Sequence, residues 1–125
     1  MNTINQEHSE LNISTQKEKN REHYKIPILT SLYEMDKETY WNPQEIQEHW
    51  QKVGYLKLSS EDRREEEFTI GENKVKRKVY KNRHAWALVE LQQENLIEKR
   101  AKNIKEYKIT EKGIRSLKEE GIIEN

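Results

Sequence analysis

Residues 82–109 read NRHAWALVELQQENLIEKRAKNIKEYKI, and this stretch decides the fold that the sequence predicts. Its first half predicts a helix that is capped by Asn82 and runs to about Gln93. Asn95 follows, at a position where a left-handed residue commonly ends a helix. The apolar side of this predicted helix consists of Trp86, Leu88, Val89 and Leu91.

The second half of the stretch predicts a β-hairpin. Short strands over residues 96–100 and 105–109 flank the polar residues 101–104. A helix followed at once by a charged two-stranded hairpin is typical of the winged variant of the helix-turn-helix. We therefore expect a mainly α-helical fold with a small antiparallel β-hairpin, the winged helix-turn-helix.

Helix signals on both sides of this stretch complete the predicted order. One helix is expected over residues 26–35, a second up to residue 53, a short helical turn near residues 58–62 and a last helix after residue 110. The residues that mark their starts and stops are Pro27 in a first turn, Asn42 and Pro43 at a start, Gly54 at a stop, Thr110 at a cap and Gly121 at a stop.

Length and composition predict one domain. The chain has 125 residues, of which 32% are apolar and 37% charged, so the expected core is thin. Residues 1–24 are polar and predict a mobile tail, which leaves residues 25–125 for the winged-helix domain. The absence of cysteine excludes a disulfide scaffold and a thiolate metal site. The sequence has no apolar run of membrane-spanning length and no signal pattern, so we expect a cytoplasmic protein.

The charge is balanced in total but unevenly distributed. Lys and Arg number 23, as do Asp and Glu. Residues 74–83 contain no acid, whereas residues 61–67 contain five acids. A turn at residues 71–73 is expected within the polar connector that joins these two stretches. The distribution of charge, and not its total, therefore bears on a polyanionic partner.

The basic run leads directly into the predicted long helix. Arg83 and His84 fall in its expected first turn, where the helix dipole disfavours a cation and backbone N–H groups can take a phosphate oxygen. An arginine here could also reach a guanine edge in the major groove. The candidate DNA-binding residues on and before this helix are Lys76, Arg77, Lys78, Lys81, Asn82, Arg83, His84 and Gln92.

The predicted hairpin repeats this signal, because its basic residues after position 98 are accompanied by a single acid, Glu106. Such a wing suits a phosphate strand or a minor groove. Two structural explanations stay open: charge runs are usually solvated, and lysines often protect an edge strand from aggregation. The candidate DNA-binding residues of the wing are Arg100, Lys102, Asn103 and Lys105.

Catalytic and metal sites find little support in the sequence. The four histidines lack metal-ligand spacing, and the acids of residues 61–67 lack the arrangement of a metal-dependent nuclease. Ser59 and Ser60 have no partner base in view. We therefore expect a protein without enzymatic activity, metal or cofactor.

Several segments resemble a known family. They are LSSEDR at residues 58–63, VYKNRHAWA at residues 79–87, Leu91 with LIE at residues 96–98, and YKITEKG at residues 107–113. Together they resemble the N-terminal domain of Mrr-type restriction endonucleases, although Asn95 stands where that family usually has glycine before the wing. The resemblance implies a winged helix that positions an enzyme on DNA, with Asn82 and Arg83 opening its recognition helix and Trp86 as a packing anchor.

The nuclease domain of that family has no counterpart in these 125 residues. The resemblance therefore implies a stand-alone module that binds double-stranded DNA in a restriction or mobile-element system, with a separate nuclease or effector protein as its partner. The alternative is a protein-interaction adaptor whose winged helix no longer contacts DNA. Zero net charge and the acidic stretch suit this alternative.

Overall fold

The computed structural model describes residues 22–124, so the tail expected over residues 1–24 lies outside the described residues except at its end. The first described helix, here called the N-terminal helix, covers residues 22–36. The other helices and strands follow in the order α2 (Pro43–Val53), α3 (Ser60–Arg63), β1 (Glu65–Ile70), β2 (Asn73–Lys78), α4 (Val79–Gln93), β3 (Ile97–Ala101), β4 (Ile104–Ile109) and α5 (Glu111–Glu119).

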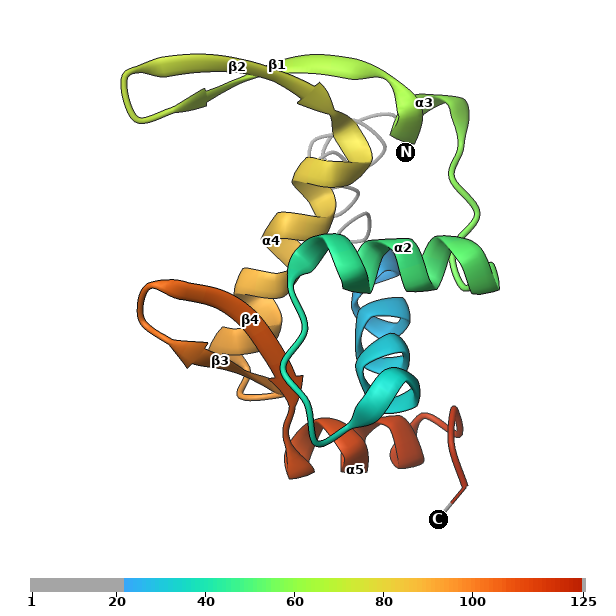
Figure 1. Ribbon diagram of the computed structural model, residues 1–125. Helices are drawn as coiled ribbons and strands as arrows, with labels where there is room; N and C mark the ends of the chain where they lie inside the picture. Colours follow the sequence, from blue (N-terminus) through green and yellow to red (C-terminus); the bar gives the residue numbers. More distant parts are fainter. Residues whose placement is uncertain (1–21, 125) are drawn as a thin grey trace, which may run out of the picture.

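Helices dominate the fold, and two antiparallel hairpins complete it. Figure 1 shows the N-terminal helix, α2 and α5 gathered on one side of α4, while the hairpins β1–β2 and β3–β4 project from its other side. The hairpin β3–β4, here called the wing, follows α4 directly as in a winged helix-turn-helix. The predicted fold class, mainly α-helical with a small antiparallel hairpin, is confirmed.

A short backbone bridge ties the wing to the helical body. Trp41 and Tyr107 exchange both of their backbone hydrogen bonds, each with an N···O distance of 2.8 Å. Trp41 lies directly before α2, and Tyr107 lies in β4. The wing is therefore paired on one edge at its base and extends into solvent only toward its turn.

The core lies where the N-terminal helix, α2, α4, the wing base and α5 meet. Helical spacing brings Ile28 and Leu32 to one face of the N-terminal helix, and Leu88 and Leu91 to one face of α4. Trp50 is fully buried between them and receives the ring of Tyr24 edge-on, with centroids 5.7 Å apart. The remaining fully buried large side chains of this core are Leu29, Ile46, Ile97 and Leu117.

The N-terminal helix extends further toward the N-terminus than the sequence indicates. Residues 22–25 are helical, so Pro27 lies inside the described helix and not in its first turn. Tyr24 is 2% exposed, which places the end of the expected tail in the core. Burial of this aromatic ring explains why the helix persists through residues that are polar in sequence.

Side chains cap three of the helices. Asn42 and Glu45 form a capping box at α2, Ser59 and Asp62 form another at α3, and Thr110 accepts a hydrogen bond from Gly113 N in α5. These starts were predicted. The predicted cap of the long helix is wrong, because α4 begins at Val79 and its cap position is Lys78, which makes no side-chain cap hydrogen bond.

The connector between α3 and α4 is a second hairpin, which the sequence prediction missed. The strands β1 and β2, here called the arm, pair antiparallel through all six of their residues around a turn at Gly71, where φ is 62°. The turn at this point was predicted. The strands were not, because Glu and Lys are poor strand formers and only Phe68, facing Val75, supplies a half-buried apolar pair.

Within the described range, no helix is both long enough and apolar enough to cross a membrane.

Candidate nucleic-acid interface

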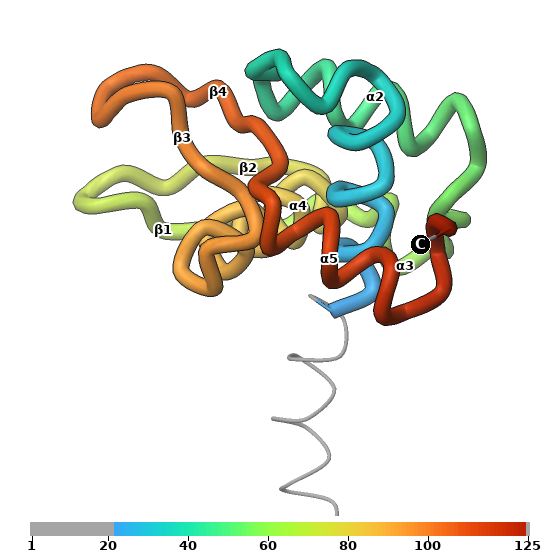
Figure 2. Tube along the Cα trace, turned by 90° about the horizontal axis from the view of Figure 1, so that it is seen from below, coloured from blue at the N-terminus to red at the C-terminus, as the bar shows by residue number. Residues whose placement is uncertain are grey.

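The side of α4 that faces away from the core carries four residues at helical spacing. Asn82, Trp86, Val89 and Gln93 lie at positions i, i+4, i+7 and i+11, which share one face of a helix. We call this set the outer stripe. Figure 2, seen from below, shows the arm and the wing extending to the same side of the molecule, and Figure 1 shows them at the two ends of α4. The stripe therefore lies between two projecting hairpins.

Two residues of the outer stripe were expected in the core. Trp86 is 51% exposed and Val89 is 39% exposed, so their predicted place on the apolar side of the helix is wrong. The buried side of α4 is instead made by His84, Ala87, Leu88 and Leu91. Trp86 and Val89 were placed on the wrong side because α4 carries apolar residues on both sides, and only packing decides which side is covered.

His84 belongs to the core. It is 3% exposed, Trp50 Nε1 donates to its Nδ1 at 3.2 Å, and its Nε2 lies 3.1 Å from the carbonyl oxygen of Pro43. Because Nδ1 accepts, the proton sits on Nε2 and the ring is neutral. Burial lowers the pKa of His84 to about 4, despite the opposing hydrogen bond to Pro43. The predicted role of His84 in contacting a base or phosphate is therefore wrong.

Arg83 is held by acids of α3. Its Nη1 donates to Asp62 Oδ1 at 2.7 Å and its Nη2 to Glu61 Oε1 at 3.3 Å, and its side chain is 18% exposed. Since α4 begins at Val79, Arg83 lies beyond the first turn, where the dipole no longer opposes a cation. The sequence indicated that a cation at this position serves to bind a ligand. The structure instead gives Arg83 an internal partner, because Asp62 balances its charge.

The Asp62 carboxylate also accepts hydrogen bonds from Tyr24 and Ser59. Tyr24 Oη donates to its Oδ1 at 2.8 Å, and the backbone and hydroxyl of Ser59 donate to its Oδ2. Burial raises the pKa of Asp62, but these hydrogen bonds and the one from Arg83 together bring the pKa below its ordinary value. The carboxylate is therefore ionised and fixes α3 against α4 and the N-terminal helix.

The basic strand of the arm faces the acidic one. Within the arm, Glu65 lies opposite Lys78, Glu66 opposite Arg77 and Glu67 opposite Lys76. The four acids of residues 65–78 equal the four bases in number, so the arm carries no net charge. Facing carboxylates reduce the attraction of Lys76, Arg77 and Lys78 for phosphate, which the linear sequence could not reveal.

The wing retains an excess of positive charge. Arg100 is paired with Glu106 at 2.8 Å, and Lys108 lies over the ring of Tyr40. Lys102 and Lys105 are exposed next to the turn, as is Asn103, and neither lysine has an ion-pair partner among residues 22–124. Of the predicted wing residues, Lys102, Asn103 and Lys105 are therefore presented at the tip, while Arg100 is partly neutralised.

The two flanks of the outer stripe differ in charge. Gln92 borders a groove of about 350 Å³. Lys99 and Lys102 are among the wing residues that line the other side of this groove. Lys81, which is exposed, lies on the same flank of α4 as Gln92. The opposite flank faces the N-terminal helix, where Lys25 Nζ lies 3.3 Å from Glu90 and 2.7 Å from Glu94. Accessible cations thus gather on the wing side.

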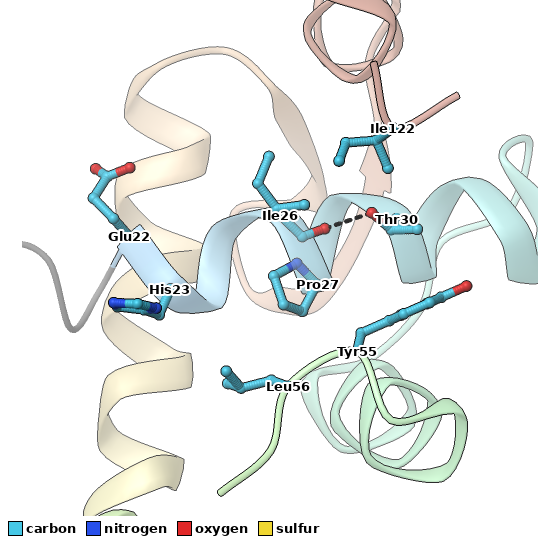
Figure 3. Close-up of a pocket in the computed structure, with 8 residues that line it drawn as sticks. All are labelled: Glu22, His23, Ile26, Pro27, Thr30, Tyr55, Leu56 and Ile122. Carbon is cyan, nitrogen blue, oxygen red and sulfur yellow. Dashed lines mark hydrogen bonds between the residues drawn. The ribbon is translucent and has the colours of Figure 1, made fainter. Parts of the chain in front are cut away.

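A separate apolar cavity of about 580 Å³ lies beside the N-terminal helix. Figure 3 shows Ile26 and Pro27 of this helix facing Leu56 and Tyr55 on one side and Ile122 on the other. Thr30 turns its hydroxyl back to the carbonyl oxygen of Ile26 at 2.7 Å, so it offers no donor to the cavity. The cavity is mostly apolar, although Glu22 and His23 also line it, and it shares no lining residue with the groove beside the wing.

A metal site finds no support in the part of the chain that the structure describes, since no three His, Cys, Asp or Glu residues there are grouped as ligands. Comparison of the chain with protein-family models, with curated proteins and with solved structures gives no match. The resemblance to Mrr-type N-terminal domains therefore stays a prediction.

Proposed function

We propose that this chain is a non-enzymatic, DNA-binding winged-helix protein that holds duplex DNA between its wing and the outer stripe of α4. The observation that carries the proposal is the pair Lys102 and Lys105, which are exposed at the wing tip without an acidic partner among the described residues. A projecting cationic hairpin beside an exposed helix face suits a phosphate backbone next to a groove.

The start of α4 supports the same proposal. Its first turn contains no acid, and its cap residue Lys78 makes no side-chain cap hydrogen bond. Lys81, the third residue of the helix, is exposed. Val79 N donates to Arg64 O at 2.9 Å, which leaves the next N–H groups for other acceptors. Phosphate oxygens suit such a helix start.

The residues proposed to bind phosphate differ from those that the sequence alone predicts. The wing lysines and Lys81 supply the phosphate contacts, whereas Lys76, Arg77 and Lys78 contribute less because acids face them across the arm. A restriction-linked role with a separate nuclease or effector protein is part of the proposal, and it is supported by the resemblance at residues 58–63 and 79–87.

Matched charge reversals in the two hairpins test the proposal. Binding of a fluorescent mixed-sequence duplex is followed by anisotropy between about 50 and about 200 mM salt. We expect Lys102→Glu with Lys105→Glu to weaken binding at least tenfold and to reduce the salt slope by about 2. The control, Lys74→Glu with Lys76→Glu in the arm, should have a smaller effect. Absence of binding by the unaltered chain at low salt would overturn the proposal.

A protein-interaction adaptor is the second candidate. The exposed Trp86 and Val89 favour it, because tryptophan is enriched at protein interfaces and because the arm is neutral. The same variants distinguish the two candidates. An adaptor should still bind its partner protein after charge reversal of the wing, whereas a DNA-binding protein should bind duplex DNA more weakly.

A further inference from the structure

The outer stripe combines two kinds of side chain and carries no charge. Asn82 and Gln93 at its ends provide side-chain amides, and Gln92 adds a third amide on the flank that borders the wing. Trp86 and Val89 between them provide exposed apolar surface. Lysines border this uncharged stripe on the wing side, so a polyanion attracted there is brought against amides and apolar groups.

This combination matches one kind of base pair in the major groove. The amide of Asn or Gln pairs with N6 and N7 of adenine, and apolar side chains contact the 5-methyl group of thymine. Guanine is instead read mainly by Arg or Lys. Arg83, the arginine of α4, is unavailable for this purpose because Asp62 and Glu61 hold its guanidinium.

We propose that the outer stripe of α4 reads A·T base pairs in the major groove of duplex DNA, through the amides of Asn82 and Gln93 and the apolar surface of Trp86 and Val89. The inference rests on the proposed function, since it names the DNA that this site prefers. The wing supplies attraction that does not depend on sequence, and the stripe supplies the preference.

Four duplexes that differ only in their central base pairs test the proposal. Their cores contain A·T pairs, G·C pairs, A·U pairs, which lack the thymine methyl group, or inosine·cytosine pairs. Inosine·cytosine presents the major-groove edge of G·C with a minor groove that resembles A·T. We expect the A·T core to bind about tenfold more tightly than the G·C and inosine·cytosine cores. Replacement of thymine by uracil should cost about fourfold for each methyl group contacted.

Two exposed Val–Gln pairs provide matched variants. Val89→Ala with Gln93→Ala alters the stripe, whereas Val53→Ala with Gln51→Ala alters exposed residues of α2. The stripe variant should lose the A·T preference but retain salt-dependent binding to every duplex. The α2 variant should retain both, and thermal unfolding confirms that both variants are folded.

The outcomes separate this inference from the proposed function. If no duplex binds, the proposed function fails. If all four duplexes bind equally, or if the inosine·cytosine core binds as well as the A·T core, DNA binding stands but readout by the stripe is overturned. Retention of the A·T preference in the stripe variant overturns it as well.

Discussion

Arg83 Nη1 donates to Asp62 Oδ1 at 2.7 Å and thereby joins α4 to α3, directly beside the place where the arm leaves the helical body. Both side chains are mostly buried, at 18% and 14% exposure, and Tyr24 shares the same carboxylate oxygen. An arginine that looks available to DNA in the sequence thus fixes the helix that presents the outer stripe.

Loss of this ion pair should destabilise the fold more than it weakens DNA binding. Arg83→Ala leaves Asp62 buried without its cation, so we expect the free energy of unfolding to fall by about 1–3 kcal/mol. Urea unfolding of Arg83→Ala, Asp62→Asn and the double variant gives the coupling energy between the two side chains. Additive effects would contradict a direct interaction, and a large loss of affinity in folded Arg83→Ala would return this residue to the DNA site.

Acidification should destabilise the protein through His84. Its pKa is lowered by burial from 6.5 to about 4, so the unfolded chain takes up a proton before the folded one does. Stability from the neutral ring is fully present above about pH 6.5 and is lost as the pH falls toward 4, by about 3 kcal/mol in total. Urea unfolding at several pH values measures this loss.

His84→Gln is the control for that pH dependence. A glutamine can still accept from Trp50 and donate to Pro43 but does not titrate. The difference in unfolding free energy between the two proteins should narrow as the pH falls from 6.5 to 4. A constant difference over this range would contradict the prediction, because it would mean that His84 has the same pKa in the folded and unfolded chain.

Neutralising the acidic strand of the arm should strengthen DNA binding if the arm approaches the duplex. Replacement of Glu65, Glu66 and Glu67 by Gln leaves the facing Lys78, Arg77 and Lys76 without carboxylates. Each cation that then contacts a phosphate should steepen the salt slope by about 0.9. An unchanged affinity and slope in the anisotropy titration would mean that the arm projects away from bound DNA.

Gly113 should not tolerate a methyl group. A Cβ at this position would lie 2.3 Å from the carbonyl oxygen of Leu96 and 2.7 Å from Cγ1 of Ile109. Gly113→Ala therefore forces α5 away from the start of the wing, and we expect a loss of about 1–3 kcal/mol in the free energy of unfolding. The exposed Arg115→Ala on the same helix is the comparison, with an expected effect within about 0.5 kcal/mol. Equal melting temperatures for the two variants would contradict this packing.

The wing, the left-handed Asn95 before it and the caps of α2, α3 and α5 were predictable because their signals are local, whereas the cap of α4 was not. A cap, a positive φ or a short strand depends on a few neighbouring residues, and Asn42, Asn95 and Thr110 each occupy the expected position. The pairing of Trp41 with Tyr107 was not predictable, since it joins residues far apart in the chain. It explains Trp41, which has no clear role in the sequence alone.

The candidate site was harder to predict than the fold. His84 and Trp86 are neighbours on one helix, yet the polar ring is buried and the larger apolar ring is half exposed. His84 can be buried because it makes hydrogen bonds with Trp50 and Pro43, and only tertiary packing brings these partners to it. The charge of the arm could not be predicted for a similar reason, because strand pairing places an acid opposite three of its four bases, Lys76, Arg77 and Lys78.

The arm begins and ends at one point, since Arg64 O accepts the hydrogen bond of Val79 N at 2.9 Å. The segment between them could lengthen, shorten or be exchanged over evolution while the helices on either side keep their places. Variation among related chains should therefore concentrate in this appendage, and it offers a natural position at which to graft a new recognition element onto the same scaffold.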